Sequence, residues 1–307
     1  MPIILVFDTE TTGFPPLMNM PKTTHKERMT VNALKTALFH SSEPNVEAWS
    51  TWSPKWNNII QISYILYHTE SNEFKTFDKY VKLPIELVEG FLSKEETHYT
   101  VRDALTEWKA ANSRGETQDL KDVMHQFLQD FALSDIIVGH NVDYDKNMVL
   151  AELMSLHLST KDARYLDTFV ELQRSDKFVC TAQRGVDVCK IEMSGSDGKT
   201  FFKFPRLNEL YKHLFGHSPD EKKLHNALND VIVTFRCFYI IEYGEDIYSK
   251  NHEIDSLIDY ITPDLNPEKS LSRGIKKYSK QRRRSKRKNY KGKNYKGKNK
   301  KRSLKNN

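Results

Sequence analysis

The sequence predicts an α/β protein with a mixed five-stranded sheet flanked by helices. Its first apolar segment, residues 3–7, is a continuous run of β-branched and aromatic side chains, which is typical of a strand buried on both faces. Two further strand-like segments follow, and short apolar strands then alternate with helical patterns. Strands that come first and are later mixed with helices indicate a mixed sheet.

The second and third expected strands are residues 59–67 and 74–81, joined as a meander by a turn at Ser71 and Asn72. Residues 15–58 separate the first strand from the second and hold several prolines, three tryptophans and one short helical stretch. A connection of this length is too long to be passive, so we interpret it as an insertion.

Residues 120–241 contain patterns that predict further strands and helices. Residues 120–131 place apolar side chains at the i, i+3, i+4, i+7 spacing of an amphipathic helix. A short strand at 136–138 leads into a helix at 145–158, with Asp145 expected at its N-cap. The remaining expected elements are a strand at 165–166, a hairpin excursion at 175–203, and helices at 207–214 and 227–241.

Charge divides the chain into an acidic body and a basic tail. The 307 residues carry 47 basic and 41 acidic side chains, but residues 271–307 hold 18 Lys and Arg and no acid. Residues 1–270 therefore have a net charge of −12. We expect one domain at 1–245 with insertions at about 15–58 and 175–203, a linker at 246–270 and a disordered tail at 271–307.

The tail has two interpretations of similar weight. Its clustered cations, with Tyr290 and Tyr295 interleaved, are typical of segments that bind single-stranded nucleic acid. The basic run at 276–288 is equally typical of a nuclear-localisation signal. No apolar run approaches the length of a membrane span, and the N-terminus lacks a charged leader, so we expect an intracellular protein, cytoplasmic or nuclear, with no membrane partner.

Acidic side chains follow or end several expected strands. Asp8 and Glu10 are two residues apart on a strand, so their carboxylates project from the same face and can share one metal ion. Asp145 follows the strand at 136–138, with Asp143 as a rival for the same role. Each acid taken alone is as readily a turn residue or a helix cap.

His225, together with Asp230, is the third candidate. Five residues on a helix place two side chains about 140° apart, so both cannot face one site from within the same helix. We therefore expect His225 to precede the helix and to turn back over a site that Asp230 reaches from the first turns. A surface or core role is the ordinary alternative for a lone histidine.

The ordered combination of these segments is more specific than any one of them. The motifs are DTETTG at residues 8–13, GHNVDYD at 139–145 and HNALND at 225–230. In this order they resemble the DEDDh family of 3′-to-5′ exonucleases, which includes proofreading, repair and RNA-processing enzymes. The likeness extends to YLDT at 165–168 and FPRLNEL at 204–210, and it covers about residues 3–243.

The resemblance implies an RNase H-like fold and assigns roles to residues. It implies Asp8, Glu10, Asp145 and Asp230 as metal ligands, with the aromatic-Asp ending of the middle motif favouring Asp145 over Asp143. His225 is implied as the general base, which suits its ordinary pKa of about 6.5. Four carboxylates form a hard-oxygen set, so we expect two divalent ions, Mg²⁺ with Mn²⁺ as a substitute.

The resemblance also implies where the substrate binds. Backbone groups around Thr11 and Thr12 are implied to hold the terminal nucleotide, and Phe14 to wedge against its base. Trp49, Trp52 and Trp56 are candidates for stacking on unpaired bases, but we favour a private core for the insertion. The resemblance implies hydrolysis at the 3′ ends of DNA or RNA with release of nucleoside 5′-monophosphates, and we favour single-stranded 3′ ends as the partner.

Two other functions use the same residues. A catalytically idle nucleic-acid-binding module would keep the fold, although all five catalytic positions are filled. A phosphatase or nucleotide hydrolase would use the same acids but gives no reason for a basic tail. The sequence leaves open the choice of DNA or RNA, of single or double strand, and of monomer or dimer.

Overall fold

The computed structural model describes residues 1–20, 22, 24–41, 43–195 and 198–262. The expected tail at 271–307 and the end of the expected linker, residues 263–270, lie outside the described residues. The chain forms two compact units. The first comprises Met1–Arg184 and Glu221–Phe235, and the second comprises Gly185–Asp220 and, as far as the structure describes the chain, residues 236–262.

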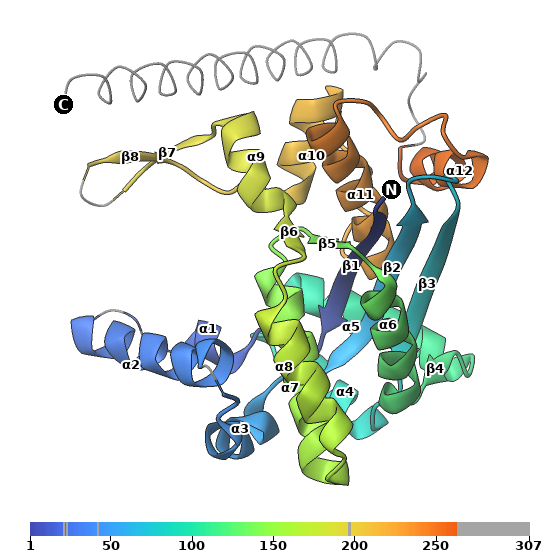
Figure 1. The fold of residues 1–307 in the computed structure, drawn as a ribbon. Helices are drawn as coiled ribbons and strands as arrows, with labels where there is room; N and C mark the ends of the chain where they lie inside the picture. The colour runs from blue at the N-terminus through green and yellow to red at the C-terminus, as the bar shows by residue number, and fades with distance from the viewer. Residues whose placement is uncertain (21, 23, 42, 196–197, 263–307) are drawn as a thin grey trace, which may run out of the picture. The chain divides into compact units, whose positions relative to one another are not determined.

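The first unit is built on a mixed six-stranded sheet. Its strands are β1 (Ile3–Thr11), β2 (Ile59–His68), β3 (Phe74–Val81), β4 (Thr117–Gln118), β5 (Ile136–Gly139) and β6 (Phe178–Cys180). They lie in the order β4-β3-β2-β1-β5-β6 (Figure 1). β2 is antiparallel to β1 and β3, as the meander predicts, whereas β5 is parallel to β1 and β6, and β4 to β3. The α/β class and the mixed sheet are therefore confirmed.

The expected count of five strands is wrong, and so is the strand at 165–166. Those residues belong to α8 (Ala163–Arg174), which begins after Asp162, whose side chain accepts the Arg164 N–H. Phe169 and Leu172 are buried three residues apart, which is helical spacing. The N-cap and this spacing outweigh a two-residue apolar match, and the short edge strands β4 and β6 complete the sheet instead.

Helices cover both faces of this sheet. Those of the first unit outside the insertion are α4 (Ile85–Leu92), α5 (Tyr99–Ser113), α6 (Leu120–Leu133), α7 (Asp143–Thr160), α8 and the first part of α11 (Ala227–Tyr243). The helix α9 (Thr181–Cys189) begins in this unit and ends in the second, to which α10 (Leu207–Phe215) and α12 (His252–Ile261) belong. On one face Phe7 of β1, Tyr64 of β2 and Phe127 of α6 are in ring contact, with centroids 5.5 and 5.8 Å apart. On the other face Tyr67 of β2 packs on Phe235 of α11.

The insertion is helical and joins the main core. Its elements are α1 (Pro16–Asn19), α2 (His25–Lys35), a π-helical turn (Thr36–His40), α3 (Val46–Trp52) and a 3₁₀ turn (Ser53–Lys55). Trp49 is fully buried against Phe169 of α8, and the Trp56 indole N–H points at the Met148 sulfur of α7. The private core is therefore wrong, because these two indoles fill the interior shared with α7 and α8. Trp52 is half-buried.

In the described residues, the second unit holds a small hairpin, α10, α12 and the C-terminal parts of α9 and α11. Within the expected excursion at 175–203, only β7 (Glu192–Ser194) and β8 (Thr200–Phe202) pair as a hairpin, since β6 and α9 precede them. Arg236 and Asp246 form a buried ion pair with an Nη2–Oδ2 distance of 2.8 Å. The expected linker at 246–270 contains α12, whose Ile254, Ile258 and Ile261 are buried on one face.

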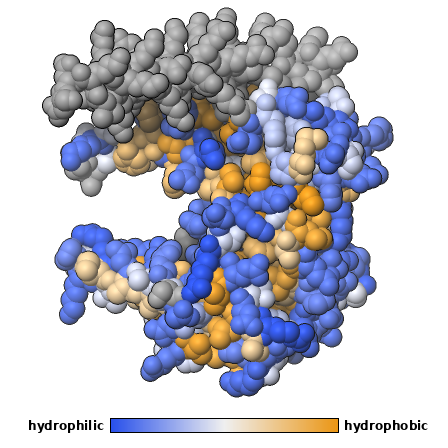
Figure 2. All heavy atoms as spheres, in the orientation of Figure 1, coloured by the Kyte–Doolittle hydropathy of each residue, from blue (hydrophilic) through white to orange (hydrophobic). Residues whose placement is uncertain are grey.

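The surface is mainly hydrophilic with scattered apolar side chains on the face drawn in Figure 2. Across the described residues, no helix combines the length and the apolar character that crossing a membrane requires.

Candidate functional site

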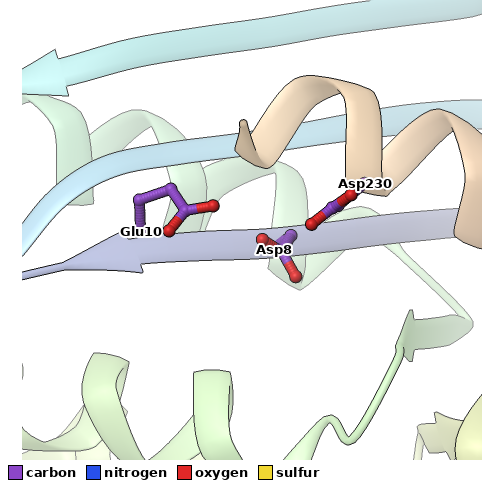
Figure 3. Close-up of side chains that lie close together, drawn as sticks. All are labelled: Asp8, Glu10 and Asp230. Atoms are coloured by element: carbon purple, nitrogen blue, oxygen red, sulfur yellow. The ribbon is translucent and has the colours of Figure 1, made fainter. Parts of the chain in front are cut away.

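Three carboxylates from two distant segments meet at the sheet. Ligand oxygens of Asp8, Glu10 and Asp230 all lie within 4.8 Å of one another, and no other group of three or more potential metal ligands occurs in the described part of the chain. Asp8 and Glu10 project from β1, and Asp230 reaches them from α11 (Figure 3). All three residues belong to the first unit and are half-buried.

β1 places its two acids on one face within the strand. The strand runs to Thr11 rather than ending at Phe7, because β2 continues to pair with it as far as Ile59. Glu10 lies opposite Gln61, and Asp8 lies opposite Ser63. Directly opposed residues of an antiparallel pair share a face, so this face carries a row of polar side chains.

Buried Gln61 connects this polar row to α11. Its Oε1 accepts the Ala227 N–H at 3.3 Å, and its Nε2 donates to Asp78 Oδ1 of β3 at 2.8 Å. Ala227 is the first residue of α11, so the bond holds the start of the helix over the sheet. Asp230 lies in the first turn and is thereby brought to the β1 acids.

Asp145 borders this cluster but is not one of the three close acids. Its Oδ1 accepts two hydrogen bonds from Thr9, and its pKa is raised to about 7, chiefly by burial. Asp143, the rival position, is exposed. The expected N-cap role is wrong, because Asn141 adopts a φ of 64° that turns the chain and α7 begins at Asp143.

The acids destabilise one another's charged forms. Burial is the largest cause that raises the pKa of Asp8 well above its ordinary value, followed by repulsion from Asp145 and Asp230. The same causes, burial first and then Asp230, raise the pKa of Glu10. Burial raises the pKa of Asp230 to about 7. A bound cation would relieve both the desolvation and the repulsion.

One oxygen of the cluster has no hydrogen-bond partner. Asp230 Oδ1 is buried and unbonded, although an unsatisfied buried acceptor ordinarily costs about 1–3 kcal/mol. The other Asp230 oxygen is 3.4 Å from the His225 backbone N–H. Carboxylate oxygens are the ligands that Mg²⁺ and Mn²⁺ prefer, so the donor set fits a hard divalent cation.

His225 precedes α11, as expected, but its ring does not lie among the acids. Its φ of 66° turns the backbone before the helix, and its imidazole stands 6.2 Å from the Tyr99 ring of α5, centroid to centroid. His225 is exposed, but partial desolvation of its ring is the largest cause that lowers its pKa; Asp103 opposes this shift and His98 adds to it. The histidine is therefore neutral near pH 7 and able to accept a proton.

The loop after β1 is held to the end of the insertion. The Thr12 N–H donates to the Asn58 carbonyl at 2.9 Å, and the Asn58 N–H donates to Thr12 Oγ1 at 3.0 Å. Thr11 Oγ1 lies 2.8 Å from both the Gly13 carbonyl and the Tyr144 hydroxyl. Both threonine side chains thus order the loop, and the Thr12 N–H is already engaged.

A row of rings lies beside this loop. Phe14 contacts His98 at 5.6 Å, His98 contacts Tyr99 at 4.5 Å, and Tyr99 contacts His225, all measured between ring centroids. Tyr99 is 63% exposed. Phe14 therefore belongs to an aromatic row with open surface, although only Phe14 and His225 were expected at the site.

Several residues that shape the site were missed from the sequence. Gln61 and Ser63 interrupt an apolar strand with two-residue spacing. This spacing is the sequence signal of a polar strand face. Thr9 lies between the two expected acids. Glu107 accepts a hydrogen bond from Asn226 at 3.0 Å and adds to the repulsion on Glu10, but it lies on the exposed face of α5, where nothing distinguishes it in sequence.

No protein-family model matches this sequence, and no curated protein matches it either. The functional case for this chain therefore depends on its own motifs and on the geometry of the acidic cluster.

Proposed function

We propose that this protein is a metal-dependent 3′-to-5′ exonuclease that hydrolyses terminal phosphodiesters of DNA or RNA and releases nucleoside 5′-monophosphates. The observation that carries the proposal is the meeting of Asp8, Glu10 and Asp230, with one buried oxygen unbonded and Asp145 alongside. The antiparallel β3-β2-β1 meander followed by parallel β5 is compatible with an RNase H-like fold, which is part of the proposal.

The acids would hold two divalent cations, Mg²⁺ or Mn²⁺. Asp8, Glu10 and Asp230 would supply ligand oxygens to these ions, and Asp145, which repels the charge on Asp8, would supply a further one. Two such ions, when bound, activate the attacking water and neutralise charge on the scissile phosphate and the leaving 3′ oxygen. Thr9 orients Asp145 toward this task through its two hydrogen bonds.

His225 would be the general base. Its lowered pKa keeps the ring neutral near pH 7, and its backbone is tied to Asp230, which fixes the loop beside the acids. The ring must turn from Tyr99 toward the cluster to take the proton, a side-chain movement available to an exposed residue.

The aromatic row would bind the strand end. Phe14, His98 and Tyr99 offer ring surface in a row that leads to His225, and stacking on bases is tolerant of sequence. This supports unpaired 3′ ends as substrates. The basic tail would add attraction for the strand or a nuclear address, and residues 271–307 lie outside the described residues.

The proposal is tested by incubating the protein with 5′-labelled DNA and RNA oligonucleotides in Mg²⁺, Mn²⁺ or EDTA. Wild-type protein should produce a ladder that shortens from the 3′ end only with metal. Asp8→Asn and Asp230→Asn should abolish it, whereas His225→Ala should slow cleavage and still bind metal. Asp143→Asn is the matched control, since this exposed acid lies two residues from Asp145 and outside the cluster.

Blocked substrates separate the alternatives. A 3′-phosphate or a circular single strand should resist degradation if a free 3′ end is required. Cutting of circles would identify an endonuclease instead. Tight binding without cleavage under all metal conditions would identify the idle nucleic-acid-binding module.

A further inference from the structure

The hairpin of the second unit exposes four large apolar side chains that no catalytic role explains. Met193 is 47% exposed, Phe201 52%, Phe202 46% and Phe204 61%. Met193 lies on β7, Phe201 and Phe202 lie on β8, and Phe204 follows β8 by two residues. Large apolar side chains gathered on one exposed element commonly mark an interaction surface rather than a folding requirement.

The strand register places these side chains on both faces of the hairpin. Met193 pairs with Phe201, and Glu192 pairs with Phe202. Opposed residues of an antiparallel pair share a face, and successive residues alternate, so Phe201 and Phe202 point to opposite sides. Both sides of this two-stranded sheet therefore present an aromatic ring to solvent.

Cations surround the rings. Lys190, Lys199 and Arg206 are exposed in the same stretch, and Lys203 pairs with Glu209 at 2.7 Å. Residues 190–206 contain four basic and two acidic side chains, although the whole of residues 1–270 has a net charge of −12. Figure 2 shows apolar and hydrophilic residues side by side along the hairpin. The stretch is thus locally positive within an acidic body.

We propose that this hairpin is a stacking surface for the unpaired bases of single-stranded nucleic acid, with Phe201, Phe202 and Phe204 as the stacking rings. The proposal deepens the proposed exonuclease function and rests on nucleic acid being its substrate. Exposed rings flanked by the exposed cations Lys190, Lys199 and Arg206 suit a strand that offers both bases and phosphates. Protein interfaces are instead depleted of lysine relative to the rest of the surface.

The test measures binding of fluorescent single-stranded oligonucleotides to the full-length protein by anisotropy in EDTA. A salt concentration of about 0.2 M weakens the contribution of phosphate–cation contacts to the affinity, so that the contribution of base stacking dominates. Phe204→Ala should weaken binding by about fivefold or more, as the loss of one stacked base predicts. Leu133→Ala is the matched control, because Leu133 of α6 is also 61% exposed, and it should change nothing.

Two substitutions at the same position separate stacking from apolar docking. Phe204→Trp should retain the affinity, whereas Phe204→Leu should lose it, since leucine is apolar but has no ring to stack. Equal binding by wild-type, Phe204→Ala and the Phe201→Ala/Phe202→Ala double variant would overturn the proposal. So would a dimer in sedimentation that the double variant converts to monomer, because the surface would then serve a second copy of the chain.

The outcome is independent of cleavage. Asp8→Asn should bind the oligonucleotide through the hairpin as wild-type protein does. Hairpin-dependent binding without any metal-dependent cleavage would refute the exonuclease and retain the stacking surface. Metal-dependent cleavage with no contribution of the hairpin to affinity would refute the stacking surface and retain the exonuclease.

Discussion

The Asp145 carboxylate is held by a single residue of β1. Thr9 donates its backbone N–H to Asp145 Oδ1 at 3.0 Å and its hydroxyl to the same oxygen at 2.7 Å. β5 pairs with β1 only as far as Val6, so the first turn of α7 takes the place of a neighbouring strand here. Thr9 thus links the DTETTG motif at residues 8–13 to the GHNVDYD motif at 139–145.

Thr9→Val should reduce cleavage about tenfold, a typical cost of removing a group that orients a metal ligand. Valine keeps the shape and loses the hydroxyl, so the pKa of Asp145 rises further and its carboxylate is less firmly placed. Single-turnover cleavage at saturating Mg²⁺ measures the effect. Thr106→Val on α5 is the control, since that hydroxyl bonds only the Arg102 carbonyl in its own helix; an equal loss in both variants would contradict the role of Thr9.

Asp8→Asn should stabilise the metal-free protein while removing its response to Mg²⁺. The substitution takes away one of several mutually repelling carboxylates. A gain of about 1 kcal/mol corresponds to a rise in Tm of about 2–4 °C for a chain of this size. Thermal melts in EDTA and in Mg²⁺ test both effects, and Asp143→Asn should show neither. A metal-free Asp8→Asn protein that melts below wild type would mean that the carboxylate is structurally required.

Glu152→Gln should flatten the pH dependence of stability. Glu152 of α7 is buried, accepts the Ile59 N–H at 2.9 Å, and has a pKa raised by burial to about 7. Between pH 4.5 and 7 the folded protein keeps the proton that the unfolded chain releases, so this residue lowers stability as pH rises through that window. The full effect is at most about 3 kcal/mol.

Urea unfolding in EDTA at pH values of about 5 and 8 measures this difference. Wild-type protein should lose more stability than the variant on going to the higher pH, because glutamine can accept the Ile59 bond without titrating. An identical loss in both proteins would show that Glu152 does not titrate in this window.

Tyr99→Ala should weaken the binding of strand ends without unfolding the protein. The ring is 63% exposed, so the change in stability should stay within about 0.5 kcal/mol. Loss of one stacking ring should raise KM about fivefold or more and leave kcat nearly unchanged. Tyr260→Ala on α12, where the ring is 57% exposed, is the control. A fall in kcat with unchanged KM would instead assign Tyr99 to positioning His225.

Deletion of residues 271–307 should weaken binding to long single strands and flatten its salt dependence. Each phosphate that the tail no longer neutralises removes about 0.7 from the slope of log affinity against log salt. Cleavage of very short oligonucleotides should change little, since they need only the acidic cluster. Anisotropy titrations at several salt concentrations measure the slope. An unchanged slope would contradict nucleic-acid binding by the tail and favour the nuclear-localisation interpretation.

Local patterns were sufficient for several long elements and insufficient for the short ones, and the 15-residue helix α5 was not predicted. The predicted strand at 74–81 matches β3. Phe77 and Val81 lie four residues apart and are buried on the same face of that strand. The two-residue match at 165–166 failed, because a segment this short takes the structure of its surroundings and Asp162 starts a helix there. β4 and β6 are equally short and exist only because a neighbouring strand edge is available.

The sequence by itself determined the α/β class, the same-face placement of Asp8 and Glu10, and the position of His225 before its helix. Each of these follows from local periodicity or spacing, which a few consecutive residues decide. The family resemblance implied that Asp230 shares a site with the β1 acids, but only the tertiary structure decided how closely they meet, that Thr9 holds Asp145, and that the His225 ring rests on Tyr99. Those contacts join residues more than 100 positions apart, and their geometry depends on how helices pack over the sheet.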